Sequence, residues 1–174
     1  MKKIILIFSF IALIIGISVQ KVQAQASINA HATAEVIQAL TATESATLNF
    51  GRFSPETAGG EVKLSPDGVR SSSGTVAMGG GIYNPAIFYL TGQPEFSVTI
   101  TLPAVAVLLT NSANGKTMEV TNWESYPSAS GSGVKMLSNG LLTLSIGATL
   151  KVGNMNDNPV GVYAGTYAIT FSYN

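Results

Sequence analysis

The C-terminal residues 162–174 constrain the fold more than any other stretch of this chain. From Tyr167 onward the bulky residues occupy every second position, as Tyr167, Ile169, Phe171 and Tyr173, with small or polar residues between them. A two-residue period in strand-favouring residues predicts a β-strand with one bulky face and one polar face. We expect this strand to be held as a structural member of a sheet.

The N-terminal residues predict a secretory signal peptide. Two lysines precede an almost unbroken apolar run from Ile4 to Val19, and small residues around Ala24 suit a cleavage site. The run falls short of the ~20 residues that a membrane-spanning helix needs. We therefore expect residues 1–24 to be removed and residues 25–174 to form one exported β-sandwich domain, in the periplasm, at the cell surface or outside the cell.

Composition excludes several classes of function. The chain has no cysteine, which rules out a disulfide framework, a thiolate metal site and a cysteine nucleophile. Beyond the predicted signal peptide, the basic residues are scattered singly, so neighbouring residues form no basic patch for nucleic acid or anionic lipid. They are Arg52, Lys63, Arg70, Lys116, Lys135 and Lys151. We expect no nucleic-acid partner and no transmembrane anchor in the mature chain.

The start of the mature chain also alternates. One face carries the small or apolar residues Ile28, Ala30, Ala32, Ala34 and Val36, and the other face carries polar ones. Alanine favours helices, but the strict two-residue period predicts a strand over residues 26–40.

The rest of the chain predicts many short strands separated by turns. Residues 86–91 and 96–102, joined by a short polar turn, predict a hairpin, and Asn114-Gly115 predicts a second one. Residues 54–60, 124–133 and 153–159 are expected to be loops. The further strands are expected at 41–50, 62–64, 75–78, 104–109, 117–123, 141–146 and 148–152. With no convincing helical pattern, the chain predicts an all-β, antiparallel sandwich.

Four stretches in this order resemble a bacterial secreted-protein family, domain of unknown function 4402. They are the alternating N-terminus leading into Leu48-Asn-Phe-Gly51, the turn Leu64-Ser-Pro-Asp-Gly68, the segment Thr91-Gly-Gln-Pro-Glu-Phe-Ser-Val-Thr-Ile100, and the ending Gly161-Val-Tyr-Ala-Gly-Thr-Tyr167. The resemblance covers nearly the whole mature chain. It implies an exported β-sandwich and no settled activity.

The alternating ending with a tyrosine near the C-terminus is similar to spore-coat-U-type and chaperone–usher pilin subunits. That similarity implies an immunoglobulin-like, Greek-key sandwich that lacks one strand, which a neighbour's N-terminal extension supplies. The extension would be Ile28, Ala30, Ala32, Ala34 and Val36, and the groove would lie beside Tyr167, Ile169, Phe171 and Tyr173. Unlike many pilins, this chain has no cysteine pair.

Residues for catalysis or metal binding are sparse. His31 is the only histidine, and a nucleophile needs an oriented base beside it. Glu56 and Glu61 flank a glycine-rich loop, where isolated glutamates are usually solvated. The oxygen-rich run over residues 154–158 lacks the spacing of a calcium loop and favours an asparagine turn. We expect no enzyme, no cofactor and no metal.

Two functions fit these expectations. The first is a structural or interaction protein, such as a surface or fimbria-like subunit, that assembles with itself or with homologous subunits by β-strand addition. Whether residues 28–36 pair within their own chain or in a neighbour is left open by the sequence. The second is a monomeric surface module that binds glycans or proteins through loop aromatics, for which Tyr83 and Tyr126 are the candidates.

Overall fold

Antiparallel ladders join all the strands of the described chain, which confirms the predicted all-β antiparallel class. The structure, a computed structural model, describes residues 24–127, 134–135 and 139–174. Within these residues there is no helix. The predicted signal peptide and most of the predicted 124–133 loop lie outside the described residues.

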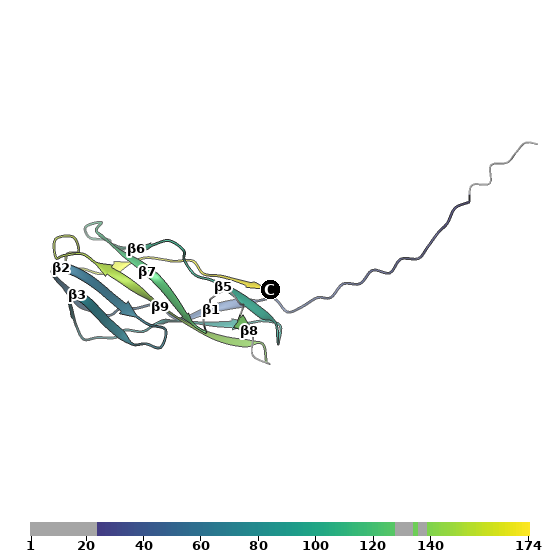
Figure 1. Ribbon diagram of the computed structural model, residues 1–174, viewed down its shortest axis with the longest axis horizontal. Helices are drawn as coiled ribbons and strands as arrows, with labels where there is room; N and C mark the ends of the chain where they lie inside the picture. The colour runs from purple at the N-terminus through teal and green to yellow at the C-terminus, as the bar shows by residue number, and fades with distance from the viewer. Residues whose placement is uncertain (1–23, 128–133, 136–138) are drawn as a thin grey trace, which may run out of the picture. The chain divides into compact units, whose positions relative to one another are not determined.

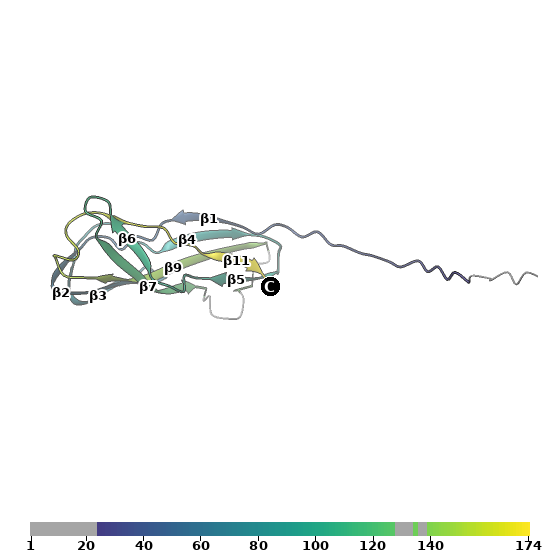
Figure 2. The same cartoon turned by 90° about the horizontal axis from the view of Figure 1, so that it is seen from above.

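The strands form two sheets. Their bounds are β1 (Thr41–Ala46), β2 (Phe53–Leu64), β3 (Arg70–Met78), β4 (Ala86–Thr91), β5 (Ser97–Thr101), β6 (Val107–Asn111), β7 (Thr117–Tyr126), β8 (Val134–Lys135), β9 (Leu141–Val152), β10 (Tyr163–Ala164) and β11 (Thr170–Tyr173). The larger sheet runs β1-β4-β9-β7-β6-β10, with β2 also on β9 and β3 on β2. The smaller sheet runs β11-β5-β8. Figures 1 and 2 show β5 and β11 side by side, at the opposite end of the domain from the β2–β3 hairpin.

The central strand β9 organises the larger sheet. One of its edges pairs with β4 over residues 141–146 and then with β2 over residues 148–152. Gly147 lies where the two neighbours meet, and a Cβ there would sit 2.2 Å from the Leu64 carbonyl oxygen. Only glycine allows the two backbones to approach this closely. The strands expected at 141–146 and 148–152 are therefore one strand.

Two hydrophobic clusters form the core. The first is built on β2, β7 and the second half of β9 around Val62, Leu64 and Leu150. The second lies between the two sheets, with Leu90 and Leu144 on one side and Val98 on the other. The partly buried side chains of Leu48 and Trp123 pack against both clusters. The second cluster accounts for the sandwich, because apolar faces of both sheets are buried against each other.

The hairpin expected from residues 86–91 and 96–102 is wrong, although both strands exist. β4 pairs with β1 and β9, whereas β5 pairs with β11 and β8. Leu90 and Val98 are both buried in the second cluster, so the two strands face each other across the core. In the segment between the two strands, the Gly92 N–H donates a hydrogen bond to Gly140 O (2.9 Å), just before β9. The hairpin predicted around Asn114-Gly115 is confirmed, with Leu109 opposite Met118.

Two other expectations need correction. Residues 54–60, expected to be a loop, belong to β2. Gly59 has a φ of +71°, and the ladder with β3 shifts register between Pro55 and Gly60, so the glycines mark a bulge within a strand. The strand expected at 41–50 ends at Ala46, and Asn49 then forms an isolated antiparallel bridge with Asn84 before the bend at Gly51 (φ +74°).

The N-terminal segment forms no strand. Residues 36–174 make up one compact unit. Residues 24–40 belong to no ladder among the described residues, and residues 24–39 are all exposed. The strand expected over 26–40 is wrong for this structure, because alternation makes a segment competent for a ladder but supplies no partner edge. Pairing of this segment within its own chain is therefore not observed.

Candidate functional site

Two unpaired strand edges face each other across the larger sheet. β2 bonds to β9 only from Gly60 onward, so its first residues pair with β3 at Phe53, Ser54 and Pro55 and with no described strand on the other side. β10 pairs with β6 and with no other described strand. Residues 165–169, between β10 and β11, belong to no strand. Backbone groups on such edges are free to form a ladder with an added strand.

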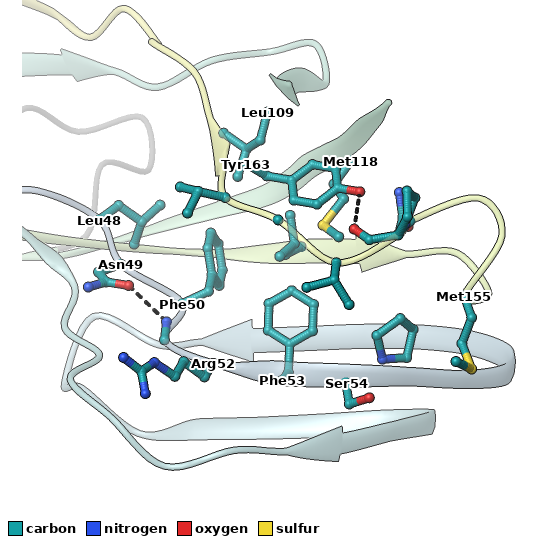
Figure 3. Close-up of a pocket in the computed structure, with 18 residues that line it drawn as sticks. Leu48, Asn49, Phe50, Arg52, Phe53, Ser54, Leu109, Met118, Met155 and Tyr163 are labelled. Carbon is teal, nitrogen blue, oxygen red and sulfur yellow. Dashed lines mark hydrogen bonds between the residues drawn. The ribbon is translucent and has the colours of Figure 1, made fainter. Parts of the chain in front are cut away.

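A groove of about 450 Å³ separates these two edges (Figure 3). We call it the β2–β10 groove. In Figure 3 Phe50 and Phe53 lie on one side and Tyr163 on the other. Its buried lining comes from Phe50, Met118 and Leu150, which also belong to the first core cluster. The groove is therefore a surface opening that reaches side chains of the first core cluster.

The outer rim of the groove is apolar and exposed. Met155, Val160 and Val162 line it and have 63%, 102% and 81% of their surfaces exposed. A cluster of exposed apolar side chains beside an apolar groove is typical of an interaction surface. Arg52 is the charged residue among those that line the groove.

Specific hydrogen bonds shape both sides of the groove. On the β10 side, Tyr163 Oη donates to Pro159 O (2.9 Å) and Asn158 Nδ2 donates to Thr117 O (2.9 Å). On the β2 side, the Arg70 guanidinium donates to Phe50 O (2.9 Å) and Gly79 O (2.7 Å). These contacts hold the walls of the groove in place.

The five candidate donor residues lie in the exposed N-terminal segment. Ile28 is 91% exposed and Val36 is 97% exposed. Ala30, Ala32 and Ala34 are also exposed. The segment therefore presents apolar side chains to solvent that no strand of the described chain covers.

The four candidate residues of the C-terminal strand pack into the core. Tyr167, Ile169, Phe171 and Tyr173 are partly buried against the second cluster, and the residues between them are exposed, which confirms the predicted two-sided pattern. Regular pairing begins only at Thr170, where β11 joins β5. None of the four lines the β2–β10 groove.

Tyr167 has an unusual environment. Its ring centroid lies 4.6 Å from that of Trp123, and its buried hydroxyl has no hydrogen-bond partner among the described residues. Burial, followed by the charge of Glu44, raises the pKa of Tyr167 to about 12. Burial is the larger cause, because an apolar environment disfavours the charged phenolate.

The two tyrosines that are candidates for ligand binding, Tyr83 and Tyr126, lie outside the β2–β10 groove. Tyr83 is 42% exposed, with the Arg70 guanidinium 4.2 Å from its ring centroid. Tyr126 is 72% exposed at the end of β7. Neither lines the β2–β10 groove.

The residues considered for catalysis and metal binding lie in separate parts of the chain. His31 lies in the exposed N-terminal segment, while Glu61 lies opposite Lys151 on β9. In the described residues, no three His, Cys, Asp or Glu side chains gather as a metal site. The run over 154–158 is an asparagine turn as predicted, since Asn154 Oδ1 accepts from the N–H groups of Asn156 (2.8 Å) and Asp157 (3.1 Å).

Sequence reasoning missed the groove because its residues come from five separate segments. The signal that was available is Val160-Gly-Val162, two apolar residues inside a polar turn region. Such residues are unexpected in a loop unless they contact something.

In a comparison with known families, residues 40–173 match the family described as Domain of unknown function (DUF4402). The chain belongs to the DUF4402 family. The DUF4402 match begins at the last residue before β1 and ends in β11, so it covers both sheets and the groove. No protein of curated function matches this chain. In the residues described for this DUF4402 protein, no helix is both long and apolar enough to cross a membrane.

Proposed function

We propose that this protein is a non-enzymatic, exported structural subunit that assembles with copies of itself by β-strand addition. In this proposal its sandwich is immunoglobulin-like and pilin-like, with Greek-key connections and one strand position open. The N-terminal segment is the donor strand, and the acceptor is an unpaired edge of another copy.

The observation that carries the proposal is the N-terminal segment itself. It has the alternation of a strand, yet residues 24–40 pair with no described strand, and Ile28 and Val36 are almost fully exposed. Adding it to a sheet edge would satisfy its backbone groups, and burying its apolar face would contribute about 25 cal/mol per Å². The alternating polar residues would remain in solvent.

A pair of double variants of the mature chain tests this proposal. Ile28→Asp with Ala32→Asp places charge on the apolar face of the segment. Asn29→Asp with Thr33→Asp adds the same charge to the opposite face and serves as the control. Both pairs lie at exposed positions, so neither should affect folding.

The measurement is solution mass as a function of protein concentration. We expect wild type and the control to form larger species as concentration rises, and the apolar-face variant to stay monomeric. Wild type that is monomeric at every concentration, or two double variants that assemble equally, would refute strand addition by this segment.

A further inference from the structure

We infer that residues 28–36 of one copy bind as a strand in the β2–β10 groove of a second copy. This inference rests on the proposed function and adds the site at which the strand is received. A strand that fills the groove would lie between two edges that pair with no described strand on that side.

The other open edges of the described sheets are less suitable. The outer edge of β1 belongs to a strand whose side chains are exposed from Thr41 to Ser45, so an added strand would find no apolar surface there. The outer edge of β3 starts with Arg70-Ser-Ser-Ser, which is polar and mostly exposed. At β11, the Tyr173 hydroxyl already donates to Gln38 O (2.9 Å).

The groove offers what an alternating apolar strand requires. Phe50, Met118 and Leu150 provide a buried apolar lining. Val160 and Val162 on the rim are exposed in the single chain and would be covered by an occupant. The small side chains of Ala30, Ala32 and Ala34 let a backbone lie close to both edges, which ladder hydrogen bonds at about 4.8 Å between strands demand.

Charge also matches the donor to the groove. Arg52 is the charged residue of the lining. Residues 24–40 contain one carboxylate, Glu35, and no lysine or arginine. A donor with this composition brings no like charge to the arginine, and its single carboxylate is of the attracting sign.

The absence of cysteine makes disulfide cross-linking a clean test, since only introduced thiols can react. One chain carries Val162→Cys. A second chain carries Ala30→Cys, Ala32→Cys or Ala34→Cys, so that either strand direction places one of the three thiols near the rim. Val105→Cys replaces Val162→Cys in the control, because Val105 is similarly exposed (77%) and lies outside the groove.

We expect oxidation of the mixed chains to give a disulfide-linked heterodimer with Val162→Cys and none with Val105→Cys. In parallel, Val160→Asp should weaken assembly at least tenfold, because it puts a charge where apolar contact forms. Val105→Asp should assemble like wild type. Both valines are exposed, so each substitution should be tolerated in the folded chain.

Different results would refute strand addition and the β2–β10 groove as its acceptor. If Ile28→Asp with Ala32→Asp abolishes assembly but Val160→Asp does not, and no donor cysteine links to position 162, the strand is received at another edge and the groove inference is overturned. If wild type never assembles and no cross-link forms, strand addition itself is refuted.

Discussion

At the scale of single residues, Tyr173 ties together three segments that are distant in sequence. Its hydroxyl accepts a hydrogen bond from Gln93 N–H (2.7 Å) and donates one to Gln38 O (2.9 Å). Its ring packs edge-on against Phe96, with centroids 5.6 Å apart. A Cβ on residue 92 would lie 2.3 Å from the Tyr173 hydroxyl oxygen, so glycine is required at this position. Tyr173 therefore holds the chain in place at Gln38, just before β1.

Tyr173→Phe should lower the free energy of unfolding by about 1 kcal/mol, because two hydrogen bonds are lost while the ring contact stays. Tyr89→Phe is the matched control, since Tyr89 is 50% exposed on β4 and should change stability little. Urea denaturation of both variants gives the comparison. Equal stability of Tyr173→Phe and wild type would show that the hydroxyl contacts do not stabilise the fold.

Tyr167 predicts a pH dependence at alkaline pH. Burial and the charge of Glu44 raise its pKa from 10.0 to about 12 in the folded protein. The neutral hydroxyl is favoured by folding, so its contribution to stability is complete below pH 10 and is lost as the pH rises through about 12.

Tyr167→Phe should remove that part of the alkaline loss. It should also leave stability at pH 7 unchanged or slightly higher, because the buried hydroxyl has no hydrogen-bond partner in the part of the chain that the structure describes. Urea midpoints of wild type and variant between pH 7 and pH 11.5 measure this. Parallel pH curves for the two proteins would contradict the assignment.

At the scale of elements, β9 depends on one glycine. Gly147→Ala would place a Cβ 2.2 Å from Leu64 O and 2.6 Å from Ser65 C, both backbone atoms. Because the backbone must move, we expect a loss of about 1–3 kcal/mol or a failure to fold. Gly80→Ala is the control: nothing lies within 4 Å of its Cβ position, and the residue is exposed.

Thermal unfolding followed by circular dichroism measures both glycine variants. Gly80→Ala should match wild type within about 0.5 kcal/mol. If Gly147→Ala were equally stable, β9 would not need the close approach to β2, and its description as one strand with two successive neighbours on one edge would be wrong.

At the scale of the whole molecule, the two core clusters should unfold together. β9 contributes Leu144 to one cluster and Leu150 to the other, and Trp123 packs against both. Unfolding of either cluster therefore exposes apolar surface of the other, which favours a single two-state transition. Trp123 is the only tryptophan, so its fluorescence reports the junction directly.

We expect the denaturation curve from Trp123 fluorescence to coincide with the curve from far-ultraviolet circular dichroism. A fluorescence transition that precedes the loss of β-structure would show that the clusters unfold separately.

The local features of this protein follow from its residues alone. The strand from Ala86 to Thr91, the turn at Ser65–Gly68, the hairpin at Asn114-Gly115 and the asparagine turn after β9 were all predictable. Each depends on hydrogen bonds or face alternation within a few residues. The two-sided pattern of the C-terminal residues 167–173 was predictable for the same reason.

Long-range pairing was decided only by the tertiary structure. The chain around Gly92 reads as a hairpin turn, yet β4 and β5 belong to different sheets because their apolar faces fill one core from opposite sides. Residues 26–40 alternate like a strand, yet no edge in the described chain pairs with them. The β2–β10 groove exists because five separate segments meet there. No local pattern encodes which faces pack together, since that is settled by the burial of the whole core at once.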